Sequence, residues 1–152
     1  MIRVQEADFE VGTELAGFAA NDLSVGGVCS FVGLVRGEAG DVAAMTLEHY
    51  PGMTERQLAA IEAEARQRWR LADLLVIHRV GRLAAGDRIV LVATAAAHRE
   101  DAFDACQFLI DWLKTKAPFW KLEHGRHGDA WVAAKDGDQS AAARWVRPWP
   151  SG

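Results

Sequence analysis

The segment Lys114-Thr115-Lys116-Ala117-Pro118-Phe119-Trp120-Lys121 decides how the second half of this chain folds. Pro118 has no amide hydrogen and disfavours helical geometry at the residue before it. We therefore predict that a helix ends just before Pro118 and that Lys121 lies on the extended stretch that follows. Lys114 and Lys121 can then converge from two different elements. The two aromatic residues between them could form an apolar wall, beside which an ammonium group is poorly hydrated and can exchange a proton near neutral pH.

The charge of this region is opposite to that of the whole chain. From Lys114 to Arg126 there are four Lys or Arg residues and one carboxylate, Glu123, whereas the 152-residue chain has a formal net charge of -4. The local excess of positive charge indicates an anionic ligand, while the acidic balance of the whole argues against general nucleic-acid binding. A single Lys is most often a solvated surface residue, so charge alone does not establish a site.

Length and composition predict one globular domain over residues 1–152. The chain is 50% hydrophobic and 25% charged, which suffices for a core of its own. No apolar run approaches the roughly 20 residues that span a bilayer, and the N-terminus lacks a signal-peptide pattern, so we expect a cytoplasmic protein without membrane contact. Cys29 and Cys106 have apolar neighbours and are expected to be buried thiols rather than a redox or metal-binding pair.

Strand-like and helix-like patterns alternate in a mixed order, which favours the α+β class. Thr54 and Gln57 match a capping box before the second helix, and the second and third strands are expected to form a hairpin. We predict strands near residues 2–5, 28–35, 43–50, 74–80, 89–93 and 131–134, and helices near 9–21, 54–69, 100–117 and 139–145.

Basic residues stand where several of these elements end, namely Arg36, His98, Arg99, Lys114 and Lys121. His98 and Arg99 stand where a strand leads into a helix N-terminus, which presents free amide hydrogens to anions. A pocket for phosphate or carboxylate follows as a hypothesis, since each charged hydrogen bond would contribute roughly 1.5 to 3 kcal/mol. His124 and His127 could bind a metal, but no third ligand is evident, so we expect no metal.

Five segments in this order resemble the large, catalytic subunit of molybdopterin synthase. They are Phe31-Val32-Gly33-Leu34-Val35-Arg36, Leu47-Glu48-His49-Tyr50-Pro51-Gly52-Met53, Val76-Ile77-His78-Arg79-Val80-Gly81, Ala97-His98-Arg99 and Leu113-Lys114-Thr115-Lys116-Ala117-Pro118-Phe119-Trp120-Lys121. The resemblance implies an α/β hammerhead-type fold and a homodimer that forms the core of a heterotetramer. It implies a small ubiquitin-like sulfur-carrier subunit with a Gly-Gly C-terminus as the partner. Two sulfurs would pass from its thiocarboxylate to cyclic pyranopterin monophosphate, forming the dithiolene of molybdopterin without a resident cofactor.

The resemblance also implies a set of site residues. Lys114 and Lys121 are the expected catalytic residues, with Lys114 facing the carrier tail and Lys121 assisting at the pterin. Because sulfur arrives on the carrier, no cysteine nucleophile is needed. The expected substrate-binding residues are these two lysines with Leu34, Val35, Arg36, His98, Arg99, Leu122, Glu123 and Arg144, of which Arg36, His98 and Arg99 would hold the phosphate.

Some features depart from the family pattern, and two other functions remain open. The 37–41 loop is shorter than is common, Leu122 stands where a basic residue is frequent, and the tail around Trp149 matches nothing in the family. One alternative is a non-catalytic module that binds an anionic metabolite or an acidic tail with the same five basic residues. The other is an aldolase-like enzyme with a lysine Schiff base at Lys114 or Lys121.

Overall fold

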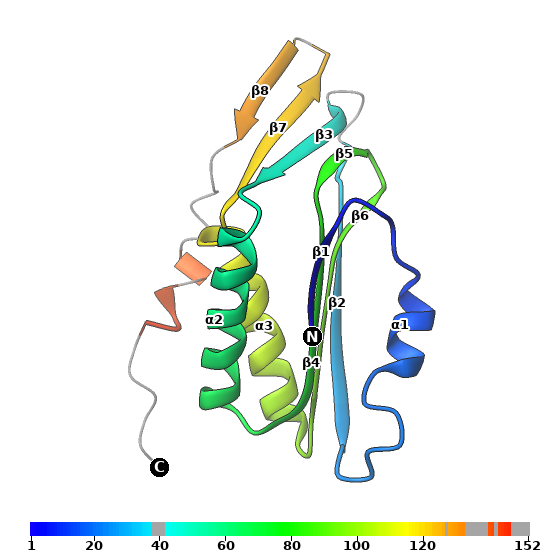
Figure 1. Cartoon of the computed structure of the whole chain (residues 1–152), viewed down its shortest axis with the longest axis vertical. Coiled ribbons are helices and arrows are strands. Elements are labelled where there is room, and N and C mark those ends of the chain that lie inside the picture. The colour runs from blue at the N-terminus through cyan, green and yellow to red at the C-terminus, as the bar shows by residue number, and fades with distance from the viewer. Residues whose placement is uncertain (38–41, 127, 133–139, 142, 147–152) are drawn as a thin grey trace.

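The computed structural model describes residues 1–37, 42–126, 128–132, 140–141 and 143–146. Strands and helices alternate along this part of the chain in the mixed order that the sequence predicts (Figure 1). The elements are β1 (Ile2–Gln5), α1 (Val11–Gly17), β2 (Gly27–Leu34), β3 (Val42–His49), α2 (Met53–Arg68), β4 (Leu71–Arg79), β5 (Gly81–Ala84), β6 (Arg88–Ala96), α3 (Arg99–Thr115), β7 (Phe119–Gly125) and β8 (Gly128–Val132).

The strands form two sheets. Sheet A has the order β1-β4-β6-β2, with β1 parallel to β4 and the other pairs antiparallel. Sheet B has the order β5-β3-β7-β8 and is antiparallel throughout. Sheet B lies beyond one end of sheet A (Figure 1). Mixed and antiparallel sheets with flanking helices confirm the predicted α+β class.

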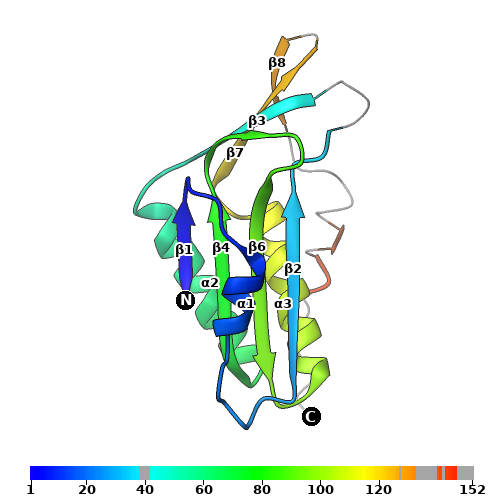
Figure 2. The same cartoon turned by 90° about the vertical axis from the view of Figure 1, so that its right-hand side faces the viewer.

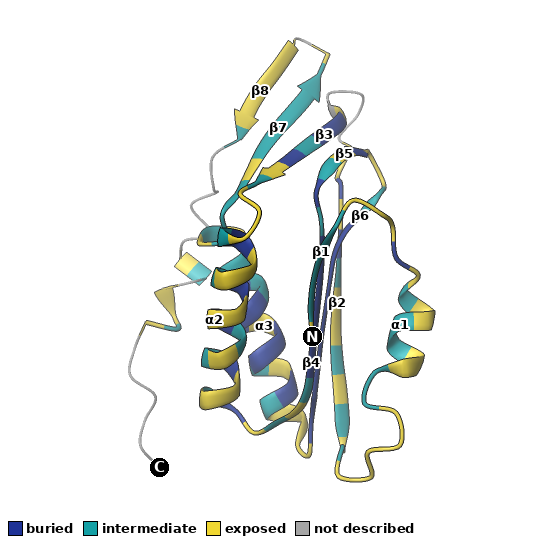
Figure 3. Ribbon diagram, in the orientation of Figure 1, coloured by how far each residue is buried: buried dark blue, intermediate teal, exposed yellow. Residues whose placement is uncertain are grey.

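Helices cover both faces of sheet A. Helices α2 and α3 lie on one face and the short α1 on the other (Figures 1 and 2). The central strands β4 and β6 are therefore buried on both sides, which explains their nearly continuous apolar sequences (Figure 3). On the α2–α3 side the core includes Leu74, Val92 and Leu109, and on the α1 side Ile77 and Leu91 pack with Phe9.

The predicted hairpin of the second and third strands is wrong. Strand β2 pairs with β6 in sheet A, whereas β3 pairs with β5 and β7 in sheet B. After β2, the Val35 N–H donates to the Asp87 carbonyl, and the chain then passes from sheet A to sheet B. Gly81 makes the same passage between β4 and β5 with φ of 86°, a left-handed conformation that favours glycine.

The second helix begins earlier than the Thr54 capping box predicts. Gly52 is the N-cap, and its N–H donates to the Glu55 carboxylate. Thr54 lies inside the first turn, where its buried hydroxyl donates to the Tyr50 carbonyl instead. The competing acceptor at Tyr50 therefore moved the cap by two residues.

Several predicted segments lie partly or wholly outside the described residues. Strand β8 ends at Val132, and the predicted continuation to residue 134 is not described. The same holds for residues 38–41 of the loop, for residues 139 and 142 of the last predicted helix, and for the Trp149 tail.

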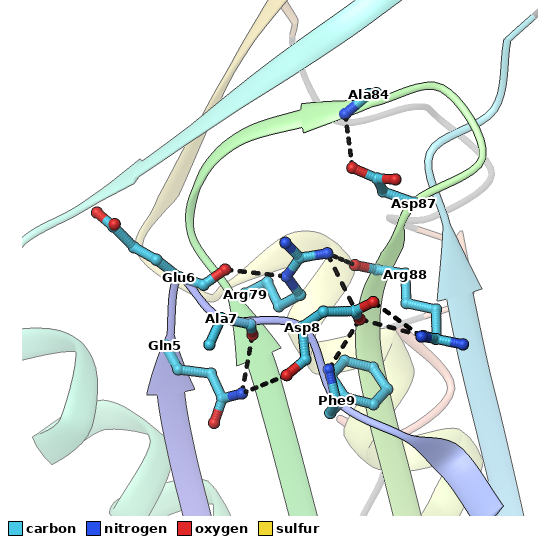
Figure 4. Close-up of polar contacts among 9 residues, drawn as sticks. All are labelled: Gln5, Glu6, Ala7, Asp8, Phe9, Arg79, Ala84, Asp87 and Arg88. Carbon is cyan, nitrogen blue, oxygen red and sulfur yellow. Dashed lines mark hydrogen bonds and ion pairs between the residues drawn. The ribbon is translucent and has the colours of Figure 1, made fainter.

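A polar cluster joins β1 to β4 and β6 at the end of sheet A nearest sheet B (Figure 4). The Asp8 carboxylate accepts hydrogen bonds from the Arg88 guanidinium at 2.8 and 3.1 Å and from the Phe9 N–H at 2.8 Å. These bonds lower the pKa of Asp8 to about 2, with the Arg88 bond as the largest cause. Arg79 donates to the Glu6 and Arg88 carbonyls, so the guanidinium faces this cluster.

Candidate active site

Lys114 and Lys121 come from two elements to the same end of the molecule. Helix α3 ends at Thr115 and β7 begins at Phe119, as Pro118 predicts, so Lys114 stands in the last helical turn and Lys121 near the start of the strand. Both act electrostatically on one buried side chain, His78 of β4. Burial is the largest cause that lowers the pKa of His78 to about 4, and the positive charges of Lys121 and Lys114 lower it further. Both positive charges therefore lie within electrostatic range of one imidazole.

The predicted apolar wall of Phe119 and Trp120 is only half right, because the two rings lie on opposite faces of β7. The Phe119 ring stacks on the His78 imidazole, with centroids 3.9 Å apart and an interplanar angle of 9°. Successive side chains of a strand point to opposite faces, so Trp120 lies on the other face of β7. There it meets Tyr50 edge to face at 4.8 Å and is 42% exposed.

Arg36 lies at the same end of sheet A as the cluster in Figure 4. It follows Val35, whose N–H and carbonyl bond to Asp87 and Gly86 in the β5–β6 turn. Arg36 itself is exposed. Leu34, also an expected lining residue, is 55% exposed, whereas the Val35 side chain is buried in the core. Val35 can therefore take part in a site through its backbone.

The other expected lining residues near the lysines differ in direction. Glu123 lies two residues after Lys121 and shares its face of β7, while Leu122 faces the opposite side and pairs with Trp131 of β8. Arg144 lies beside α3, where its Nε is 3.7 Å from the Asp111 carboxylate and donates to the Ala141 carbonyl. Asp111 stands about one turn before the end of the helix that carries Lys114.

His98 and Arg99 lie at the far end of α3 from Lys114. His98 is the N-cap, and Arg99 is the first residue of this 17-residue helix. At 1.5 Å per residue the helix is about 25 Å long. Within one chain, His98 and Arg99 therefore lie about one helix length from Lys114, and the predicted cavity for all five basic residues requires a contact between subunits. A strand-to-helix junction and the next helix-to-strand junction are necessarily opposite ends of one helix.

A shallow hollow lies between β2 and α3. Its lining is mostly apolar and includes both cysteines. Cys106 is buried, as predicted, whereas Cys29 is only half-buried. Burial, and then the neighbouring Cys29, raise the pKa of the Cys106 thiol. The lining residues are Cys29, Ser30, Phe31, Phe103, Cys106, Gln107, Ile110 and Asp111.

His124 is held by partners within sheet B. Its Nε2 lies 2.7 Å from the Thr46 hydroxyl and its Nδ1 lies 3.0 Å from the Asp129 carboxylate. His127, the second residue of the pair considered for a metal, lies outside the described residues. In the part of the chain that the structure describes, no three His, Cys, Asp or Glu side chains are grouped as metal ligands. Over the same ranges no helix is both long and apolar enough to cross a membrane.

His78 is the site residue that the sequence reasoning missed. A histidine between Ile77 and Arg79 in an otherwise apolar strand was a usable signal, because a polar group in a strand buried on both faces needs a specific partner. His49, whose ring lies 6.3 Å from that of Phe119, was also not among the predicted residues.

Comparisons with known proteins identify the family of this chain. The family model described as MoaE protein matches residues 4–116. The molybdopterin synthase catalytic subunit of Cereibacter sphaeroides is 54% identical over 144 residues, covering 95% of this chain and 99% of the relative.

Two solved structures extend the comparison. The molybdopterin biosynthesis MoaE protein of Burkholderia ambifaria is 50% identical, with a TM-score of 0.83, and the match covers 97% of this chain and 99% of that one. A complex of subunits 1 and 2 of molybdopterin-converting factor from Helicobacter pylori has the same fold at 20% identity, with a TM-score of 0.72 and coverage of 89% and 90%. These matches confirm the resemblance in the sequence: the chain belongs to the MoaE family, that of the molybdopterin synthase catalytic subunits.

Proposed function

We propose that this chain transfers two sulfurs from the thiocarboxylated C-terminus of a small carrier subunit to cyclic pyranopterin monophosphate, with Lys114 and Lys121 as the catalytic residues. The observation that carries the proposal is that α3 ends at Thr115 and β7 begins at Phe119, so that Lys114 and Lys121 flank one junction, and both positive charges act on the same buried imidazole, His78. Two positive charges fixed on different elements create a place for an anion that neither element could form alone.

The chemistry of the reaction requires such charges. The carrier tail is an anion, the pterin precursor carries a cyclic phosphate, and opening of that ring during sulfur attack develops further negative charge. Positive donors that are already in place stabilise this charge without reorganisation. Lys121 is fixed by its strand, which pairs with Leu47 of β3 and Val132 of β8. Lys114 faces the carrier tail and Lys121 the pterin.

A carrier subunit as partner is supported by the Helicobacter pylori neighbour, which is a complex of two subunits of molybdopterin-converting factor. The carrier tail would have to reach the end of α3 and the start of β7.

The far position of His98 and Arg99 supports a homodimer in which a second copy supplies them. Strand β2 is an edge of sheet A, and an edge strand can pair with another chain. Gly27, at the start of β2, pairs with Ala96, two residues before His98, while the end of β2 leads to Arg36. The large side chains that β2 exposes are apolar, namely Val28, Phe31 and Leu34, and Ser30 is exposed beside them.

The lengths of the two elements match such a pairing. A two-fold axis beside β2 would pair the β2 strands of the two copies antiparallel, because the same surface is used on both. The start of β2 in one copy would then lie beside the end of β2 in the other. The eight residues of β2 span about 27 Å, and α3 spans about 25 Å. His98 and Arg99 of the second copy would then lie near Arg36, where they could hold the phosphate beside the lysine pair.

Sulfur transfer with purified components tests the lysine roles. Lys114→Ala and Lys121→Ala should each lower the single-turnover rate by about 100-fold or more, as expected when a preorganised charge is lost. Lys116→Ala is the matched control, since Lys116 is an exposed lysine at the C-cap of the same helix, and it should keep the parental rate. A parental rate in Lys114→Ala would contradict the proposed role.

The same assay separates the alternatives. A non-catalytic anion-binding module would bind the thiocarboxylated carrier or the pterin precursor without product formation. An aldolase-like lysine would be trapped by borohydride on a carbonyl substrate. Production of the dithiolene, without borohydride trapping of a lysine, supports the sulfurtransferase.

A further inference from the structure

His78 is a polar residue buried in an apolar strand, where it needs a hydrogen-bond partner. It is 6% exposed and stands near the end of β4 in sheet A. Its Nδ1 lies 2.8 Å from the Arg79 carbonyl oxygen, which can only accept, so the proton is on Nδ1. Because the pKa is lowered to about 4, the imidazole is neutral at physiological pH.

The imidazole links the two sheets. Its stacking partner Phe119 is the first residue of β7, which belongs to sheet B, whereas His78 belongs to sheet A. An interplanar angle of 9° and a centroid distance of 3.9 Å mean that the two rings lie face to face. Rotation of the Phe119 ring, or a shift of the start of β7, would separate them.

Phe119, one ring of the stack, lies between Lys114 and Lys121 in the sequence. Lys114 stands in the last turn of α3, five residues before Phe119. The Phe119 N–H donates to the Ala117 carbonyl at 2.8 Å, which closes the turn at Pro118. Lys121 follows Phe119 by two residues and shares its face of β7. The Phe119 ring and the Lys121 side chain are thus neighbours on one face of the same strand.

The groups around His78 also favour its neutral form. Lys121 of β7 and Lys114 of α3 act on it with positive charge, and His49 of β3 also lowers its pKa. The Arg79 guanidinium lies toward Asp8, 3.6 Å from that carboxylate. A protonated His78 would place a further positive charge among these groups and repel the ammonium groups that the anion needs.

We infer that His78 is a positioning residue of this enzyme: its buried ring, stacked on Phe119, holds Lys121 in place relative to Lys114 without contacting substrate. The inference rests on the proposed roles of the two lysines. It assigns to a buried residue of sheet A a role in the alignment of charges on α3 and β7.

A double-mutant cycle tests the inference. His78→Ala, Phe119→Ala and the double variant are compared in single-turnover sulfur transfer, with carrier and pterin precursor saturating and rates expressed per folded molecule. Each single substitution should lower the rate by about tenfold, because misplacement of a catalytic group is costly. The double variant should also lose about tenfold rather than about 100-fold, because the two residues act through one contact. The KM for the precursor should change less than kcat.

A conservative variant and a control exclude a general loss of stability. His78→Phe keeps a ring that can stack and should recover most of the rate lost in His78→Ala. Thr94→Val removes a buried hydrogen bond from the Thr94 hydroxyl to the Ala102 carbonyl, 2.7 Å long, on strand β6. It should lower the Tm but leave the rate per folded molecule unchanged.

Two results would overturn the inference. One is a parental rate in His78→Ala, and the other is full multiplication of the two single effects in the double variant. If Lys114→Ala and Lys121→Ala are inactive while His78→Ala is not, the inference alone fails. If the lysine variants retain the parental rate, the proposed site fails, and His78 has no charges to position.

Discussion

Lys114 and His98 stand at opposite ends of one helix, with Lys114 in the last turn of α3 and His98 at its N-cap. The straight path between them is about 25 Å. A phosphate held by His98 in one chain therefore cannot lie beside Lys114 of the same chain. If both residues serve one reaction, each complete site combines the two ends of α3 from different copies.

Mixed oligomers test this sharing directly. Co-expression of Lys114→Ala with Arg99→Ala should restore activity that neither variant has alone. In a mixed dimer one site combines both substitutions and the other is intact, so random pairing leaves about one quarter of the sites active. The activity of the purified, differently tagged mixture measures the recovery. A site contained in one chain would show no recovery.

Phe31 should be important for self-association through β2. Phe31→Glu places a charge on the exposed apolar edge, and burial of an unpaired charge is unfavourable. We expect the dimer dissociation constant to rise by about tenfold or more, as measured by sedimentation, with a parallel loss of activity. Leu23→Glu is the control, since Leu23 is 99% exposed in the segment before β2. An unchanged dimer in Phe31→Glu would place the interface elsewhere.

The lowered pKa of His78 predicts a loss of stability in mild acid. Its folded value is about 4 and its ordinary value is 6.5. Between these values the unfolded chain binds a proton that the folded chain does not, so the free energy of unfolding falls as the pH falls from 6.5 to 4 and then stops changing. His78→Phe lacks this proton. Urea titrations should show the wild-type advantage over His78→Phe shrinking by on the order of 3 kcal/mol between pH 7 and pH 4. A constant difference would contradict the buried neutral imidazole.

Asp8 predicts a second acid transition at lower pH. The bond to Arg88 lowers the pKa of Asp8 from 3.8 to about 2, so its stabilising effect is complete above pH 4 and is lost as the pH falls toward 2. Asp8→Asn should be less stable than the wild type at pH 7 and equally stable near pH 2, in denaturant titrations at each pH. Asp22→Asn is the control, because Asp22 bonds only within its own loop, to Ser24. An equal loss in both variants would mean that the link of Asp8 to Arg88 is not what stabilises.

Local rules in the sequence predicted most of the elements and several of their ends. Pro118 ends α3 because proline lacks an amide hydrogen, and the apolar stripe of α3 faces the core because a helix repeats every 3.6 residues. The strands β4 and β6 are recognisable because burial on both faces requires continuous apolar sequence. The family blocks added the expected function and the expected site residues.

The partners of each strand were not available from the same rules. Strands β2 and β3 are neighbours in sequence and still enter different sheets, because pairing depends on contacts with β6 and β7, which lie far along the chain. The predicted capping box at Thr54 failed for a local reason: the Thr54 hydroxyl donates to the Tyr50 carbonyl, four residues earlier, and does not cap the helix.

What the sequence by itself determined is the set of charged groups at the element ends, and the length of α3, from which the separation of His98 and Lys114 follows at 1.5 Å per residue. Only the tertiary structure decided which groups share a neighbourhood. It brought His78 of β4 onto the ring of Phe119 of β7, within electrostatic range of two lysines, because packing of sheet A against the start of sheet B is a long-range event that no local pattern encodes.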